Sequence, residues 1–316
     1  VCVSRSEGTP YVILEALSQG KTVISSNYGG ELIIEDGKSG YVFNNTIDDL
    51  DRVFKHALQH PINGIDRLKE GYYSPKIVKK LDEFFISFLP LVSICIPNYN
   101  GAKFLEQSLE SVLAQNYPNI EIIIVDSNST DNSPEILTRY AHNNNNNITA
   151  IYQPERTGIA TSLNVCLRNT KGKYFVPWHS DDIMLPRDSI SRRVLELSRR
   201  PSVGMVYGIL KLIDKSNKEI GKWDPGQIGY RELQKRNPIA NPATMFRMDT
   251  VRQIGGYDEE IEHGEDYYLN LAISKRNPIL YAPFIVAHYR HHSGMDSIGR
   301  DYTKWDKMIR EKVLSL

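Results

Sequence analysis

The chain has 316 residues, a length that suits two domains. Hydrophobic residues make up 41% of it and charged residues 24%, as in ordinary soluble globular proteins. Lys and Arg together number 38, as do Asp and Glu, and this balance lacks the basic excess of polyanion-binding proteins, so we expect no nucleic-acid partner.

Cysteines, apolar runs and glycosylation sequons indicate the compartment. Cys2, Cys95 and Cys166 form an odd, widely spaced set, which is neither a disulfide framework nor a metal site and favours a reducing compartment. The sequence shows no signal-peptide pattern and no apolar run near the roughly 18 residues of a membrane span. A sequon at Asn128 lies just after Asp126, where we place a ligand site, and a glycan there would block that site; the alternative is that such tripeptides arise by chance. We therefore expect a cytoplasmic location.

The first 89 residues alternate short strands with helices. Pro10 near the start and Gly20 just past the end bound the first predicted helix, and Thr46 caps another that runs to His60. We expect strands at 1–3 and 21–26 and helices at 10–19, 46–60 and 76–89. The opening strand–helix–strand unit is too incomplete to be a domain alone.

A different pattern begins at Leu91, where strands and helices alternate. The continuous apolar run at 120–126 is typical of a parallel strand covered on both faces. Asn100 is expected to cap the helix before it, and Asp131 or Asn132 the helix after it. The alternation predicts an α/β fold with a parallel sheet and right-handed crossovers. We expect strands at 91–97, 120–126, 148–153 and 173–178, and a helix at 157–168.

The simple alternation ends after Asp182, and helices become more frequent. We expect strands near 203–213 and 278–290 and helices at 186–199, 229–236, 248–254, 264–276 and 301–316.

Acidic residues end two of the predicted strands, Asp126 on one and Asp181 with Asp182 on the other. Ligands of open α/β sheets bind beyond the carboxyl ends of the strands, so these carboxylates converge if the strands are neighbours. Oxygen ligands of this kind hold Mg²⁺ or Mn²⁺ beside a diphosphate. The alternative is a solvated Asp-Asp turn that caps the next helix, and these residues alone do not decide between the two.

Five segments in order resemble family 2 glycosyltransferases of the GT-A fold: VSICIPNYNG, LEQSLESVLAQNYPNIEIIIVDSNSTDNS, GKYFVPWHSDDIMLP, FRMDTVRQIGGYDE and HGEDYYLNL. The resemblance implies a GT-A nucleotide-diphospho-sugar transferase domain over 90–316, with a mostly parallel sheet flanked by helices. It also implies inverting, metal-dependent transfer of a sugar from a nucleotide-sugar, a UDP-sugar by default, to a glycan or lipid-linked acceptor. Such an acceptor would bring the protein to the inner membrane face peripherally.

The same resemblance implies the donor site. The loop around Pro97 and Tyr99 would cradle the nucleotide base, and Asp126 would bind the base or ribose. Ser127 stands where the family often has a second Asp. Gly158 and Asn164 match a segment that lines the donor site in the family. The alternatives are that Gly158 only starts a helix and that Asn164 only lies on a helix surface. The implied donor-binding set is Pro97, Tyr99, Asp126, Gly158, Asn164, Ser180 and Asp181.

A divalent metal, Mn²⁺ or Mg²⁺, is implied at the Asp-x-Asp place, which Ser180, Asp181 and Asp182 occupy. Asp181 would be the main ligand and Asp182 would support it. His179 replaces the first Asp of a common family version, Asp-Ser-Asp-Asp. Similar family segments place a His or Arg of the late cluster at 289–292 near the diphosphate or metal. Because adjacent strand residues point oppositely, we expect His292 rather than His291 to face the metal; a polar strand end is the alternative.

Glu265 and Asp266 begin the helix predicted at 264–276. The resemblance implies that Asp266 is the general base, which takes the proton of the acceptor hydroxyl, with Glu265 beside it. The alternative is an acidic first turn that the helix dipole favours.

The N-terminal segment resembles the donor-binding half of family 4 glycosyltransferases of the GT-B fold, where Glu7 and Glu15 match two glutamates that flank a donor-site loop. The resemblance implies a partial GT-B domain over 1–89, with a boundary near 88–91, that is inactive alone. We interpret the chain as part of a longer, multidomain polymer-building enzyme whose other domains are its partners.

Two other functions were weighed. A Rossmann oxidoreductase needs a Gly-rich turn after its first strand, and NYNGAKF has one Gly, so we reject it. The second is a non-catalytic glycosyltransferase-like scaffold that binds a nucleotide-sugar or a partner without turnover. The replacement at His179 and the partial N-terminal domain support it, and the acidic pairs at 181–182 and 265–266 oppose it.

Overall fold

The structure is a computed structural model that divides into two compact units, Val1–Phe85 and Ile86–Leu316. The domain boundary expected near 88–91 stays a prediction, because residues 62–88 are not described. The described residues are 22–26, 34, 36–37, 40–44, 46–61, 89–143, 147–292 and 301–316. The strand expected at 1–3, the helices at 10–19 and 76–89, Glu7 and Glu15 lie outside them.

The described part of the first unit contains two parallel strands, β1 (Ile24–Ser26) and β2 (Tyr41–Phe43), and the helix α2 (Ile47–Gln59). The side chain of Thr46 accepts a hydrogen bond from the Asp49 N–H, which confirms the predicted cap. A small apolar cluster holds the three elements together, made of Ile24, Tyr41, Phe43, Val53 and Ala57.

The second unit is built on an eight-stranded sheet with the order β10-β7-β9-β6-β3-β4-β5, and β8 pairs with β7. Only β8 and β9 run antiparallel to their neighbours, so the mostly parallel α/β fold is confirmed. The strands are β3 (Val92–Asn98), β4 (Ile120–Asp126), β5 (Ile148–Tyr152), β6 (Tyr174–Pro177), β7 (Met205–Asp214), β8 (Glu219–Trp223), β9 (Thr244–Arg247) and β10 (Ile279–His291).

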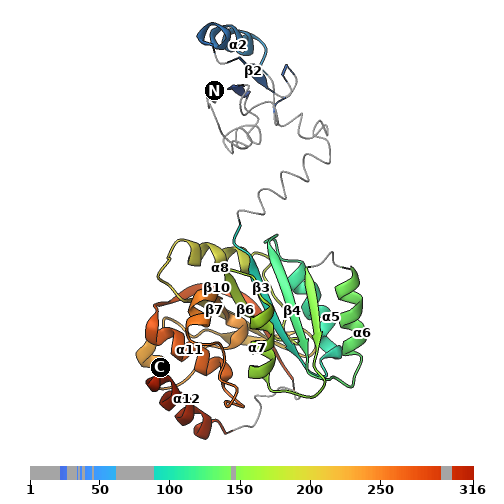
Figure 1. Cartoon of the computed structure of the whole chain (residues 1–316), viewed down its shortest axis with the longest axis vertical. Coiled ribbons are helices and arrows are strands. Elements are labelled where there is room, and N and C mark those ends of the chain that lie inside the picture. Colours follow the sequence, from blue (N-terminus) through green and yellow to red (C-terminus); the bar gives the residue numbers. More distant parts are fainter. Residues whose placement is uncertain are drawn as a thin grey trace. The chain divides into compact units, whose positions relative to one another are not determined.

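Helices pack around this sheet (Figure 1). They are α5 (Ala102–Leu113), α6 (Ser133–Asn143), α7 (Ile159–Asn169), α8 (Ser189–Ser198), α9 (Tyr230–Leu233), α10 (Met248–Gln253), α11 (Glu265–Arg276) and α12 (Thr303–Ser315). The strands β8 and β9 were not predicted. β9 has four residues, too few to show a periodicity, and becomes a strand because it fits between β6 and β7.

The start of α5 differs from the prediction that Asn100 caps it. Gly101 is the N-cap residue, and Asn100 has a positive φ of 49°. The side chain of Asn100 accepts a hydrogen bond from the N–H of Thr130, so it is engaged by a distant loop. That loop supplies the cap in return, since Asp131 accepts from the N–H of Ala102 at 2.9 Å. The predicted cap is wrong because tertiary contacts replaced a local one.

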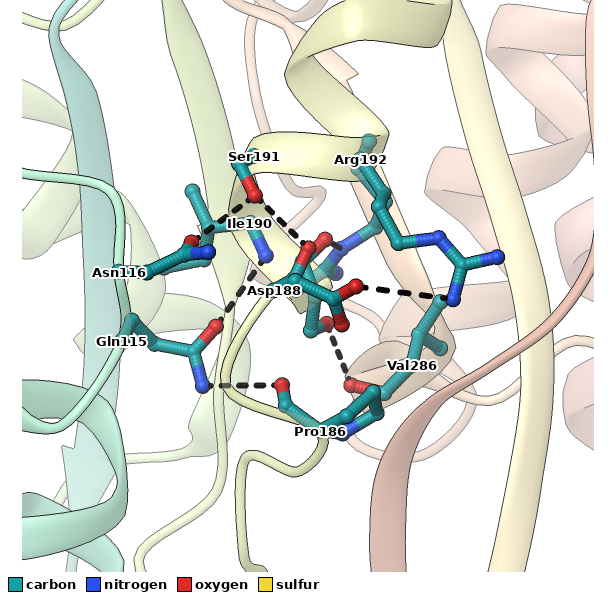
Figure 2. A network of polar contacts seen from close by, with 10 residues as sticks. Gln115, Asn116, Pro186, Asp188, Ile190, Ser191, Arg192 and Val286 are labelled. Atoms are coloured by element: carbon teal, nitrogen blue, oxygen red, sulfur yellow. Dashed lines mark hydrogen bonds and ion pairs between the residues drawn. The ribbon is translucent and has the colours of Figure 1, made fainter.

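A polar network holds the segment that follows the acidic pair of residues 181–182 (Figure 2). The amide nitrogen of buried Gln115, just beyond α5, donates to the carbonyl oxygens of Met184 at 2.7 Å and Pro186 at 3.2 Å. Ser189, at the start of α8, donates to the carbonyl oxygen of Val286 in β10 at 2.6 Å. The segment is therefore fixed to α5 on one side and β10 on the other.

Two strand glycines differ in the space around them. A Cβ on Gly208 of β7 would lie 2.5 Å from Cγ1 of Val286 and 2.9 Å from the carbonyl oxygen of Phe284, closer than van der Waals contact. A Cβ on Gly221 of β8 would meet only Leu212, at an ordinary 3.6 Å. Close packing of β10 on β7 therefore requires glycine at residue 208.

We predict that Gly208→Ala lowers the free energy of unfolding by about 1 to 3 kcal/mol, because the added methyl overpacks the β7–β10 contact. The matched control, Gly221→Ala, should change it by less than about 1 kcal/mol. Urea unfolding followed by tryptophan fluorescence measures this unit, since all three tryptophans lie in it. Equal losses in the two variants would contradict the steric argument.

Candidate active site

The carboxyl ends of three parallel strands define one edge of the sheet. β3 lies between β4, which ends at Asp126, and β6, which the acidic pair of residues 181–182 follows, so these two strands are not direct neighbours. Asn98, the last residue of β3, spans part of the gap by donating to Asp126 at 2.8 Å. Asp126 also accepts from the N–H and hydroxyl of Ser129 at 2.9 and 2.7 Å and is 1% exposed. Its carboxylate therefore orders the loop after β4.

An exposed aromatic–cation stack lies just beyond β3. The Tyr99 side chain is exposed, and the guanidinium carbon of Arg156 lies 4.2 Å from its ring centroid. Pro97 is half-buried within β3, and Gly158 is the N-cap of α7, where a Cβ would meet no atom within 4 Å. Sequence analysis missed Arg156, because an arginine in a polar loop carries no periodicity or motif signal.

Asn164, unlike Tyr99 and Gly158 of the predicted donor set, has a buried side chain that is bonded to other parts of the protein. Its amide donates to the Tyr257 carbonyl at 2.8 Å and to Glu259 at 2.9 Å, and its oxygen accepts from the Tyr257 N–H at 2.9 Å. Gly256, with a φ of 82°, lies so close that a Cβ there would be 2.7 Å from the Asn164 oxygen. The structure thus uses Asn164 to tie α7 to the turn before α11.

The segment after β6 carries two of the three predicted metal ligands, Asp181 and Asp182, and brings His179 close to them. Trp178 is fully buried and donates from its indole N–H to Ser108 at 2.9 Å. Ligand atoms of His179, Asp181 and Asp182 all lie within 4.8 Å of one another. Ser180 lies beside the start of α5, since a Cβ on Gly101 would be 2.8 Å from its hydroxyl oxygen.

The surroundings of Asp181 and Asp182 shift the pKa values of these two carboxylates in opposite directions. Burial raises the pKa of Asp181, but the hydrogen bond from His292 and the nearby His179 and His292 charges outweigh it, so the pKa is lowered. The pKa of Asp182 is raised well above its ordinary value by burial and by the neighbouring Asp181 charge. His292 Nε2 lies 2.9 Å from Oδ2 of Asp181, so the structure brings these two predicted residues together.

Arg290 lies behind the acidic pair and is 1% exposed. Its backbone N–H donates to Asp182 at 2.9 Å, and its Nε donates to the Asp181 carbonyl at 2.7 Å. Its remaining nitrogens donate to Gln107 of α5 and Asn217, each at 2.7 Å. The guanidinium lies 4.5 Å from the Phe104 ring centroid. Arg290 and His292 are two residues apart, and both reach Asp181.

The N-terminus of α11 presents Glu265 and Asp266 after Gly264, which has a φ of 87°. The amide nitrogen of buried Asn241 donates to Glu265 at 3.1 Å and lies 3.4 Å from Nε2 of His179. Asn241 thus links the two acidic groups that the sequence placed at one site. Sequence analysis missed this asparagine, because it titrates at no ordinary pH and belongs to no motif.

Asp266 is partly buried and accepts a hydrogen bond from the Tyr267 N–H at 2.7 Å. Burial raises the pKa of Asp266 to about 6, against the opposing hydrogen bonds from Tyr267 and the Asn237 side chain. A carboxylate with this pKa is mostly ionised at neutral pH and is a stronger base than ordinary aspartate.

A cavity of about 560 Å³ opens near the network of Figure 2. It is lined by Leu185, Pro186, Arg187, Arg192, Lys211, Ile285 and His288. No residue of the predicted donor, metal or base sets lines it, so we assign it no part in the chemistry of this site.

Family models match both parts of the chain. The model described as glycosyl transferase family 2 matches residues 93–252, which is 160 of the 316 residues. The chain therefore belongs to glycosyl transferase family 2, a family of enzymes that transfer glycosyl groups. A second model, glycosyl transferases group 1, matches residues 1–60, so both predicted resemblances are confirmed.

Curated relatives are longer proteins. An uncharacterized glycosyltransferase of Rickettsia felis is 28% identical over 231 residues, which cover 70% of this chain and 37% of that protein. The hyaluronan synthase of Pasteurella multocida is 28% identical over 204 residues, which cover 64% of this chain and 21% of that protein. The chain thus spans about a fifth to somewhat over a third of these two relatives.

Solved structures share the fold. TarS residues 1–349 of S. aureus, in complex with UDP-GlcNAc, align with a TM-score of 0.59 and 16% identity over 71% of this chain and 66% of that one. The mannosyltransferase PcManGT of Pyrobaculum calidifontis, in complex with GDP-Man and Mn²⁺, aligns with a TM-score of 0.52 and 22% identity over 72% and 63%. The GT-A-like fold is confirmed. None of the helices in the described part of the chain is both long and apolar enough to cross a membrane.

We predict that Arg290→Lys lowers the free energy of unfolding by about 2 to 5 kcal/mol, because one ammonium cannot replace a planar fork bonded to several acceptors. The control, Arg139→Lys, changes an exposed ion pair with Glu106 and should cost less than about 1 kcal/mol. Urea unfolding measures both. A small, equal effect in the two variants would show that Arg290 is not needed to hold the acidic segment.

Proposed function

We propose that the second unit is an inverting, metal-dependent glycosyltransferase domain that uses a nucleotide-sugar donor. The observation that carries this proposal is the convergence of two acidic groups on one site. His179, Asp181 and Asp182 form one group, Glu265 and Asp266 begin the other, and Asn241 contacts both. Such a site can hold a diphosphate–metal pair on one side and an acceptor hydroxyl on the other.

The residues present fit a divalent metal, Mn²⁺ or Mg²⁺. Asp181 and Asp182 would hold it through carboxylate oxygens, with His292 beside Asp181. Oδ2 of Asp182 is buried without a hydrogen-bond partner among the described residues, and a cation would satisfy it. When bound, the metal offsets negative charge on the leaving diphosphate. The Mn²⁺ in PcManGT supports this assignment.

Asp266 is the proposed general base. Its ionised carboxylate would take the proton from the acceptor hydroxyl as that oxygen attacks the anomeric carbon, opposite the departing nucleotide, so the configuration inverts. Burial has raised its pKa to about 6, near the range where a base is both ionised and effective at neutral pH. Glu265, held by Asn241, would shape the wall between base and metal.

The nucleotide would lie over the ends of β3 and β4. The exposed ring of Tyr99, stacked with Arg156, offers a surface for a base, and the arginine offers charge to a phosphate. Asp126 would contact the ribose or base through the loop it orders, with Pro97 below and Gly158 leaving open space for the donor. Ser180 would line the same side.

The relatives and solved structures support the donor and acceptor classes that we propose. TarS binds UDP-GlcNAc and PcManGT binds GDP-Man, so a UDP-sugar is the first donor to test and a GDP-sugar the second. The similarity to a hyaluronan synthase supports a glycan acceptor, with a lipid-linked glycan as the second choice. The proposed parent enzyme is longer, lies in the cytoplasm and reaches the membrane only through its acceptor; the relatives of which this chain covers 37% and 21% support the greater length.

Donor binding tests the metal–diphosphate arrangement. We expect one nucleotide-sugar of a UDP and GDP panel to bind by calorimetry more tightly with Mn²⁺ than without it. Asp181→Ala should weaken this metal-dependent binding by about 10- to 100-fold, because a carboxylate ligand is removed. Asp249→Ala, an exposed acid on α10, is the control and should leave it unchanged. A folded chain that binds no donor would instead support the scaffold interpretation.

Base catalysis gives a separate prediction. Asp266→Asn should lower kcat by about 100- to 10,000-fold, because the amide cannot accept the proton, while donor binding persists. In the wild-type chain the rate should fall as pH drops through about 6, where Asp266 becomes protonated, and level off above it. Product assays with the nucleotide-sugar that binds in the calorimetric panel measure both kcat and its pH dependence. An Asn variant that keeps the wild-type rate and pH profile would exclude Asp266 as the base.

A further inference from the structure

His179, which replaces the first Asp of the common Asp-Ser-Asp-Asp pattern, lies in one cluster with Asp181 and Asp182. We infer that His179 is a nitrogen ligand of the divalent metal, and that this ligand turns the preference of the site away from Mg²⁺ and toward Mn²⁺ and Co²⁺. This inference rests on the proposed function and deepens it, because it concerns which cation the same site selects.

Geometry places the imidazole of His179 among the ligand atoms. Its ring nitrogen, an oxygen of Asp181 and an oxygen of Asp182 all lie within 4.8 Å of one another. Three such atoms can therefore meet one ion with small side-chain adjustments, since metal–ligand distances are about 2.0 to 2.2 Å. The cluster is not purely acidic, so it differs in kind from a patch of surface carboxylates.

A second observation at the cluster itself points to a cation. Asp182 is 1% exposed, and its Oδ1 accepts from the N–H of Arg290, but its Oδ2 has no hydrogen-bond partner among the described residues. A buried carboxylate oxygen without a partner is costly, and a metal ion would offset that cost. The neighbouring imidazole would then be one of the nearest other donors to the ion.

The backbone and ring of His179 are held in place. Its carbonyl oxygen accepts from the Ser108 hydroxyl at 3.1 Å, and the preceding Trp178 is anchored by its own bond to Ser108. The ring Nε2 lies 3.4 Å from the amide of Asn241, which is itself bonded to Glu265. Ligands that are oriented by such outer contacts bind metals more tightly than free side chains do.

The identity of the ligand decides the selectivity. Mg²⁺ demands oxygen ligands and gives up its water slowly, whereas first-row transition ions accept imidazole and bind nitrogen sites more tightly along the series from Mn²⁺ to Co²⁺. An aspartate at residue 179 would make a site of oxygen ligands, which accepts Mg²⁺ as well as Mn²⁺. A histidine there, with His292 in contact with Asp181, makes a mixed nitrogen and oxygen site that favours the transition ions.

The test compares metal affinities, which do not depend on turnover. Calorimetry would measure Mg²⁺, Mn²⁺ and Co²⁺ binding to the wild-type chain, His179→Asp and the control His142→Asp, which makes the same change at an exposed residue of α6. We expect the ratio of Mn²⁺ to Mg²⁺ affinity to fall at least about tenfold in His179→Asp, because oxygen replaces nitrogen in the site. The ratio should not change in His142→Asp.

Pulsed electron paramagnetic resonance of bound Mn²⁺ gives the second readout, since a coordinated imidazole nitrogen modulates the signal. We expect this modulation in the wild-type chain and in His292→Gln, and its loss or reduction in His179→Asp. An unchanged modulation and an unchanged ratio of Mn²⁺ to Mg²⁺ affinity in His179→Asp would overturn the inference. It would also be overturned if His179→Asp changed only the affinity for the nucleotide-sugar donor. Failure of the wild-type chain to bind metal and donor would instead overturn the proposed function.

Discussion

The buried guanidinium of Arg290 is the interaction on which the candidate site depends. It comes from β10, yet it bonds to the carbonyl of Asp181, to Gln107 of α5 and to Asn217. Its own N–H holds one oxygen of Asp182. A buried cation with so many acceptors fixes a strand edge, a helix and an acidic segment in one arrangement. The other oxygen of Asp182 accepts no hydrogen bond from the described residues, and it is the one that the proposed metal would satisfy.

A second contact joins the two acidic groups of the candidate site, which are the proposed metal side and the proposed base side. Asn241 lies outside the strands and the longer helices, and its side-chain amide contacts both Glu265 and His179. The chemistry of sugar transfer requires that the leaving group and the incoming hydroxyl be held in register. In the proposed mechanism a neutral, buried link of this kind would help to do so without adding a charge to the site.

Much of this arrangement was predictable from the sequence, and the failures have identifiable causes. The strand ending at Asp126 was predicted to the residue, because a run of apolar residues bounded by polar ones has few other structures. The cap at Asn100 was wrong, since Thr130 from a distant loop engages its side chain. Arg156 and Asn241 were missed, because their roles come from partners that are 57 and 24 residues away, at Tyr99 and Glu265.

The sequence by itself determined the α/β class, the family and the candidate acids at residues 126, 181–182 and 265–266, because periodicity and motif spacing are local properties. Only the tertiary structure decided which of these groups meet. It inserted β3 between β4 and β6, the strands that precede the two groups of acids. It bonded the Asn164 side chain to the turn at Tyr257, and it placed His179 and His292 beside Asp181. Those contacts depend on sheet order and on packing between distant segments, which no local pattern encodes.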